Sequence, residues 1–302
     1  MKKTLCTVSA MVLALAAAPV MAQDSLKIGM SFQEMNNPYF VSMQEALNEA
    51  ADSIGAEVVV TDAAHDVAKQ ISDIEDMLQQ GIDILLINPT DSAGVESAVT
   101  MAKAQDVIVV AVDAQANGPV DTFVGSKNRD AGYMSCKYLA DELGGEGEVA
   151  ILDGIPVIPI LERVEGCKAA FAEYEGITLV DTQNGRQDRS VALGVVENMI
   201  QSHADLAGIF SVNDGGAMGA LAAIQGSGRD IKLTSVDGAP EAVKAVADGG
   251  PFIETTAQFP RDQVRVGLAM ALAQKWGARV VPKAVPIDVR VVDKENAADF
   301  AW

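Results

Sequence analysis

The sequence is poor in the residues that most catalytic and metal sites use. It has two histidines, His65 and His203, and three cysteines in 302 residues, and neither histidine has a partner at metal-ligand spacing. No Gly-x-Ser-x-Gly motif is present, and the glycine-rich stretch 144–147 lacks the lysine of a phosphate-binding loop. The sequence therefore predicts no catalytic residue, no metal site and no cofactor.

Basic residues and aromatic residues are also scarce. There are 22 Lys and Arg against 42 Asp and Glu, and the net charge is −20. Such a chain repels nucleic acid and anionic lipid over about 10 Å, so nucleic acid is not expected as a partner. Aromatic residues make up 5% of the sequence, whereas Ala, Val, Ile and Gly are plentiful, which is typical of parallel strands that alternate with helices.

Long apolar runs are absent beyond the first residues. Residues 1–22 have the pattern of a signal peptide: Lys2 and Lys3, an apolar run over 8–18, and small residues before Gln23. The run is too short to span a bilayer, which takes about 20 residues. We expect cleavage near Ala22 and a location outside the cytoplasmic membrane; the alternative is a buried N-terminal helix.

Two cysteines, Cys136 and Cys167, follow this segment. In an oxidising compartment an isolated pair forms one disulfide. The alternative is two buried free thiols that pack as small apolar side chains. The sequence leaves both open, because it does not show whether the two Cα atoms lie within about 7 Å.

Short apolar runs alternate with amphipathic segments along the whole chain. In the segment 67–80, Val67, Ile71, Ile74 and Leu78 recur with the helical period, and Gly81 follows. This rhythm predicts a parallel sheet with helices on both faces. Strands are expected at 26–32, 57–61, 82–87, 107–112, 148–152, 177–182, 207–211, 232–236 and 252–257, and helices at 40–54, 67–80, 94–105, 161–173, 189–203, 215–225 and 240–247.

The alternation of apolar runs and amphipathic segments starts again after the middle of the chain. A strand ending at Asn88 is followed by a helix and a strand ending before Asp113, and Asn213 and Asp237 repeat the pattern at nearly the same spacing. The alternative is a chance likeness between two strand–helix–strand units. We predict an α/β fold of two similar, doubly wound parallel-sheet lobes.

Ligands of open α/β sheets bind beyond the carboxyl ends of the strands, so the polar residues there are the candidates. Carboxylates and amides suit the hydroxyls of a sugar, whereas in the alternative Asn88, Asp113 and Asp237 only cap the following segments. Aromatic residues near the first strand would cover a sugar face or simply pack the first helix. The candidates are Gln33, Asn37, Asn88, Asp113, Asn213, Asp237 and Gln258, with Phe32, Tyr39 and Phe40 as the aromatic residues.

Several of these residues lie in motifs that resemble those of the periplasmic ribose-binding proteins, the binding components of ABC sugar importers. The likeness covers nearly all of the chain after the N-terminal segment. The motifs are residues 35–40, 84–91, Glu162-Arg163-x-x-Gly166, Asn213-Asp214, 236–238 and Ala257-Gln258.

The resemblance implies the type I periplasmic binding fold, with two lobes joined by a three-segment hinge at 126–128, 257–259 and 287–289. The lobes would be 23–127 plus 259–287 and 128–258 plus 288–302. It also implies a ligand that is buried when the hinge closes. The implied ligand contacts are Asn37, Tyr39, Phe40, Asp113, Asn213, Asp237 and Gln258.

The sequence also departs from the ribose-binding pattern. Ala114 and Leu161 stand where this pattern has ligand arginines, Gln187 replaces an aromatic residue, and Gln33 replaces a serine. We therefore expect a sugar alcohol, a deoxy-sugar or another small polar solute, with Gln33, Gln187 and Arg186 as donors. Arg163 is expected to be structural, paired with Glu162 or Asp153.

The function implied is the periplasmic, non-enzymatic, monomeric solute-binding component of an ABC importer, which closes around a small sugar or sugar alcohol and docks on the permease. The alternative is a sensor that delivers the same signal to a chemoreceptor or membrane kinase. An α/β enzyme is a further alternative, and the export signal argues against a repressor domain.

Overall fold

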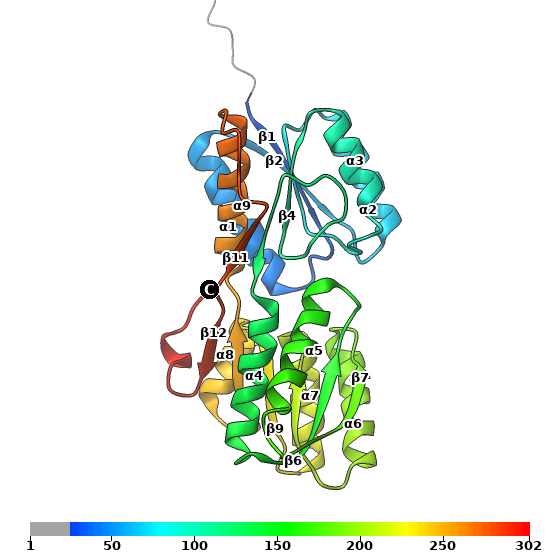
Figure 1. Cartoon of the computed structure of the whole chain (residues 1–302), viewed down its shortest axis with the longest axis vertical. Helices are drawn as coiled ribbons and strands as arrows, with labels where there is room; N and C mark the ends of the chain where they lie inside the picture. The colour runs from blue at the N-terminus through cyan, green and yellow to red at the C-terminus, as the bar shows by residue number, and fades with distance from the viewer. Residues whose placement is uncertain (1–24) are drawn as a thin grey trace, which may run out of the picture.

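The chain forms two six-stranded sheets, one above the other in Figure 1. The computed structural model describes residues 25–302, so the predicted signal peptide lies outside the described residues. Within 25–302, no helix has the length and hydropathy of a membrane span.

The first sheet has the strand order β11-β5-β4-β3-β1-β2, and all its strand pairs are parallel. Successive residues of a strand point to opposite faces, so Leu86 packs with one helical layer and Leu85 with the other. Its strands are β1 (Lys27–Phe32), β2 (Glu57–Asp62), β3 (Ile84–Ile87), β4 (Ile108–Val112), β5 (Thr122–Ser126) and β11 (Ala284–Ile287). Helices α1 (Pro38–Ile54) and α9 (Pro260–Lys275) cover one face, and α2 (Val67–Gln79) and α3 (Glu96–Ala104) cover the other.

The second sheet repeats this plan in the order β12-β10-β9-β8-β6-β7, with only the edge pair β10–β12 antiparallel. Its strands are β6 (Glu146–Asp153), β7 (Gly176–Asn184), β8 (Leu206–Ser211), β9 (Lys232–Asp237), β10 (Phe252–Ala257) and β12 (Arg290–Asp293). One face carries α4 (Asn128–Glu142) and α5 (Ile158–Phe171), and the other carries α6 (Arg189–Ser202), α7 (Asp214–Ser227) and α8 (Pro240–Asp248).

The chain passes between the two sheets three times, after β5, β10 and β11. The passages fall at residues 126–128, 257–260 and 287–290, and Figure 1 shows them side by side at the waist of the molecule. The predicted fold class is thereby confirmed. The carboxyl ends of β1 and β4 in one sheet and of β9 and β10 in the other are directed toward this waist, which places the polar residues that follow them near one another.

Helices α4 and α5 cross at unusually short distance. A Cβ built on Gly132 would lie 1.9 Å from the carbonyl oxygen of Arg163, and one built on Gly166 would lie 2.0 Å from that of Arg129. One turn away, Cys136 and Cys167 form a disulfide with their Cα atoms 5.0 Å apart. The question that the sequence left open is thus settled in favour of the bond, and α5 is held firmly on α4.

Candidate ligand-binding site

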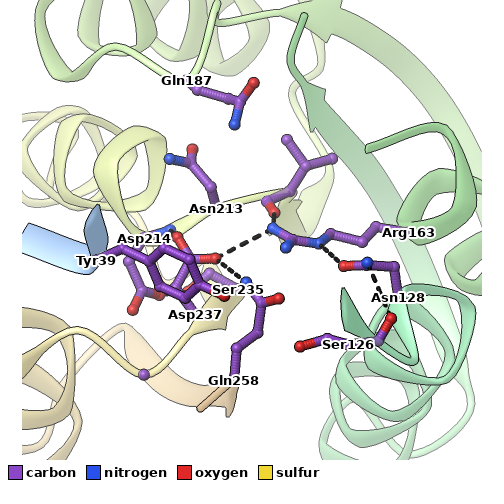
Figure 2. Close-up of polar contacts among 12 residues, drawn as sticks. Tyr39, Ser126, Asn128, Arg163, Gln187, Asn213, Asp214, Ser235, Asp237 and Gln258 are labelled. Atoms are coloured by element: carbon purple, nitrogen blue, oxygen red, sulfur yellow. Dashed lines mark hydrogen bonds and ion pairs between the residues drawn. The ribbon is translucent and has the colours of Figure 1, made fainter. Parts of the chain in front are cut away.

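A cavity lies between the carboxyl ends of the two sheets, and Figure 2 shows several of the polar side chains around it. It encloses about 390 Å³ of non-atom space when the part open to solvent is included. Its lining is Gln33, Asn37, Tyr39, Phe40, Asp113 and Ala114 from the first lobe, with Val157, Pro159, Ile160, Arg163, Gln187, Asp237 and Gln258 from the second lobe and the crossing after β10.

Asp113 follows β4 and is buried, with its backbone in the left-handed region at φ 67°. The hydroxyl of Tyr39 donates to Oδ1 at 3.0 Å, and Nδ2 of Asn88 donates to Oδ2 at 3.0 Å. Asn88 also accepts from the backbone N–H of Gln33 at 3.2 Å. Asn88 therefore orients cavity residues from behind, and it does not cap α3.

Asp237 ends β9 and is likewise buried, with φ 140°. Its Oδ1 accepts from Nη1 of Arg163 at 3.1 Å and from Nε2 of Gln258 at 2.8 Å (Figure 2). Arg163 is 3% exposed, and its Nε donates to Asn128 Oδ1 at 2.9 Å. Asp237 thus accepts bonds from a cation and an amide at once, which fixes its carboxylate at the cavity wall.

The expected partners of Arg163 were wrong. Arg163 pairs with Asp237, not with Glu162 or Asp153, and its side chain lines the cavity. The side chain of Leu161 is outside the cavity lining, and this residue is 49% exposed on α5.

Three buried polar atoms near the cavity have no hydrogen-bond partner within residues 25–302. Oε1 of Gln33 and Oε1 of Gln258 are acceptors, and Nδ2 of Asn213 is a donor. An unpaired buried polar atom costs about 1–3 kcal/mol, so such atoms call for a partner. A hydroxyl both donates and accepts, and it is the group that satisfies this mixed set best.

Part of the cavity lining is apolar, with Phe40 from the first lobe and Val157, Pro159 and Ile160 from the second. Tyr39 meets Phe40 edge to face, with ring centroids 5.2 Å apart. Phe32 is fully buried in the first core and is not among the lining residues, so its role is packing.

Besides Phe32 and Asn88, two further predicted site residues lie apart from the cavity lining. Arg186 is exposed and lines a wider groove outside the cavity, next to His65 and Asp188. Asn213 caps α7, where its Oδ1 accepts from the N–H of Gly216 at 3.0 Å. Gln187 lines both the cavity and the groove, and its Oε1 accepts from the N–H of Ile155 at 3.3 Å.

Burial dominates the electrostatics of the site. It raises the pKa of Asp113 to about 6, although the nearby guanidinium of Arg163 and the hydroxyl of Tyr39 oppose this rise. Burial, and then the negative charge of Asp237, raise the pKa of Asp214 to about 7. Within residues 25–302 no group of three or more His, Cys, Asp or Glu side chains is placed to hold a metal ion.

Glu254, in β10, is a fully buried acid outside the cavity. Ser135 donates to its Oε2 at 2.7 Å and Thr256 to its Oε1 at 2.6 Å. Burial raises its pKa from the usual value of 4.5 to about 8, and these hydroxyls only partly oppose the rise. Between about pH 4.5 and pH 8 the folded protein therefore keeps a proton that the unfolded chain has lost.

The free energy of unfolding should consequently fall as the pH rises through this window, because the unfolded state binds fewer protons there. The raised pKa values of Asp113 and Asp214 likewise lower the free energy of unfolding as the pH rises. We expect the melting temperature to be several degrees higher at pH 5.5 than at pH 8. Glu254→Gln, which mimics the neutral acid, should flatten this dependence; an unchanged slope in the variant would contradict the assignment.

Known proteins resemble the chain in sequence and in structure. The ribose import binding protein of Bacillus subtilis (strain 168) is 40% identical over 234 residues, 77% of this chain and 76% of that protein. A periplasmic solute-binding protein of an ABC transporter from Actinobacillus succinogenes, solved with D-allose, superposes with a TM-score of 0.87 at 28% identity and covers 91% of this chain and 100% of its own.

An ABC transporter solute-binding protein from Mycobacterium smegmatis, solved with glycerol, gives a TM-score of 0.86 at 32% identity, covering 91% of this chain and 96% of its own. The family model described as a periplasmic binding protein domain matches residues 28–278. With two sheets facing one polar cavity, the chain belongs to the periplasmic binding protein family.

Proposed function

We propose that the protein is the periplasmic solute-binding component of an ABC importer for a small, neutral sugar or sugar alcohol. The observation that carries this proposal is that Asp113 and Asp237, which follow strands of different sheets, line the same cavity. A carboxylate accepts bonds from two neighbouring hydroxyls, and each such charged bond contributes about 1.5–3 kcal/mol. The role is binding and delivery, without catalysis.

The charge and the apolar part of the cavity lining narrow the ligand class. Asp237 is balanced by Arg163, whereas no Lys or Arg among residues 25–302 bonds to Asp113, so the cavity disfavours an anionic solute such as a sugar acid. The apolar wall of Val157 and Ile160 suits the C–H face of a sugar ring or of a short polyol. Of the two similar proteins described above, one was solved with a sugar, D-allose, and the other with a polyol, glycerol.

Hinge closure is the mechanism we propose. The moving bodies are residues 23–127 plus 259–287 and residues 128–258 plus 288–302. The solute binds to one lobe of the open form, and residues of the other lobe then close over it. The ligand shifts the equilibrium between the open and closed forms only by the contacts that it gains in the closed form. The permease then recognises the closed monomer, which reaches the periplasm after cleavage near Ala22.

A thermal-shift screen tests the proposal. The panel contains pentoses, hexoses, deoxy-sugars, polyols of three to six carbons and sugar acids. A ligand at 100 times its Kd adds about 2.7 kcal/mol to the free energy of unfolding, and the melting temperature should rise by about 5 °C or more. Calorimetry then gives the affinity. No response to any neutral member of the panel would refute the proposal, as would turnover of the bound solute.

A further inference from the structure

The last residues described, 300–302, connect the cores of the two lobes. Phe300 packs against the core of the second lobe, and its ring centroid lies 6.3 Å from that of Phe259. Trp302 packs against the core of the first lobe instead. Figure 1 places this end of the chain at the waist, beside the passages between the sheets. Residues 300–302, which we call the strap, thus add a fourth link to the three passages of the chain.

Trp302 contacts one cavity residue from each lobe. Its indole ring meets the ring of Tyr39 edge to face, with centroids 5.8 Å apart and an interplanar angle of 82°. Its Nε1–H donates to the backbone carbonyl of Asp237 at 3.1 Å. A single side chain therefore touches the first lobe through Tyr39 and the second lobe through Asp237.

Both contacts lie directly behind the polar groups of the cavity. Tyr39 donates to Asp113, so a ring held by Trp302 keeps this hydroxyl on the carboxylate. Asp237 has a backbone conformation that residues other than glycine rarely adopt, at φ 140°, and such conformations persist only where the surroundings hold them. The bond from the indole to its carbonyl is one such restraint.

We propose that Trp302 is a positioning residue that fastens the two lobes in the closed arrangement and aligns Asp113 and Asp237 across the cavity. The two contacts of the indole exist together only when Tyr39 and Asp237 are close, so they favour the closed form over the open form. The effect on ligand affinity rests on the proposed function, whereas the effect on lobe closure does not depend on any ligand.

Ligand affinity is the first measurement, with the neutral solute found by the screen. We expect Trp302→Ala to weaken binding about 10–50-fold, chiefly through faster dissociation. Trp302→Phe keeps an aromatic edge against Tyr39 and loses the N–H donor, and it should weaken binding about 3–10-fold. Trp276→Phe is the matched control, because Trp276 is 74% exposed. The Trp276→Phe variant should bind the solute with the affinity of the parent protein.

A spectroscopic readout separates positioning from a general loss of stability. The chain has two tryptophans, so Trp276→Phe leaves Trp302 as the only emitter. Ligand should then lower the quenching of Trp302 by acrylamide, because closure buries the indole further. Unaltered quenching at saturating ligand would overturn the proposal, and so would Trp302→Ala that binds within twofold of the parent.

Lobe closure without ligand is the second measurement. Spin labels at His65 and Glu241 report the distance between the lobes. Both residues are exposed, and they line the wider groove outside the cavity from different lobes. We expect a closed population in the parent that shrinks in Trp302→Ala and in a chain lacking residues 300–302. The proposal would be overturned if the parent protein showed no closed population without ligand, or if the two variants kept the closed population of the parent. If no solute binds the parent, the proposed function fails, and this measurement still decides on the strap.

Discussion

Asp113→Asn is expected to weaken ligand binding about 30–140-fold while the fold stays intact. The replacement removes the negative charge that would accept hydroxyl hydrogens and keeps the shape of the side chain. Two charged hydrogen bonds reduced to neutral ones account for about 2–3 kcal/mol, and each 1.4 kcal/mol is a factor of ten. Asn also tolerates the left-handed backbone at this position, and Asn88 and Tyr39 remain within reach of the new amide.

Calorimetry with the solute identified by the screen measures this loss. Asp106→Asn is the matched control, because Asp106 is an exposed residue of the same lobe that also has a left-handed backbone, at φ 60°. Its affinity should stay within twofold of the parent. Equal affinities of Asp113→Asn and the parent would mean that this carboxylate does not contact the solute, and the site would have to be reassigned.

Gly132→Ala should destabilise the protein more than any other small substitution we propose, by about 3 kcal/mol or more. The added methyl would lie 1.9 Å from a backbone oxygen of α5, which no rotamer change relieves. Helices α4 and α5 would have to separate, although the disulfide between Cys136 and Cys167 resists this. Overpacking a protein core typically costs 1–3 kcal/mol. A methyl group pressed against a backbone oxygen lies at the upper end of this range.

Because the displaced oxygen belongs to Arg163, the same variant should also lose ligand affinity. Denaturant unfolding and calorimetry measure the two effects. Gly194→Ala in α6 is the matched control: nothing lies within 4 Å of the new methyl, and the change should stabilise by about 0.5–1 kcal/mol. A Gly132→Ala protein as stable as the parent would show that the two helices are not held at this distance.

The sequence predicted the fold well where burial is continuous. Strands β1, β3, β4 and β8 are almost fully buried, so their apolar runs stand out against the polar turns. Strand β5 was missed although most of its residues are buried. Strands β11 and β12 were missed because each has four residues at a sheet edge, and most of their side chains are exposed or half-buried. Helices α4 and α9 were missed as well, and the buried face of α4 is built largely from small residues such as Ala131, Gly132 and Ser135.

The candidate site was predictable only in its polar part. Asp113, Asp237 and Gln258 stand out because they follow apolar strands at the edge where ligands bind. The partner of Arg163 could not be read from the sequence: Asp237 is 74 residues away, whereas Glu162 is adjacent. The apolar residues Val157 and Ile160 carry no mark that separates a cavity wall from a core, so their role appears only in three dimensions.

The backbone at the two cavity aspartates restricts how this protein could be redesigned for another solute. Both have positive φ angles, 67° at Asp113 and 140° at Asp237, where branched or bulky residues would be strained. Most other residues at these two positions would strain the backbone by about 1–3 kcal/mol each. Diversity introduced instead at Ala114, Val157 and Ile160 would reshape the cavity without touching its anchoring acids.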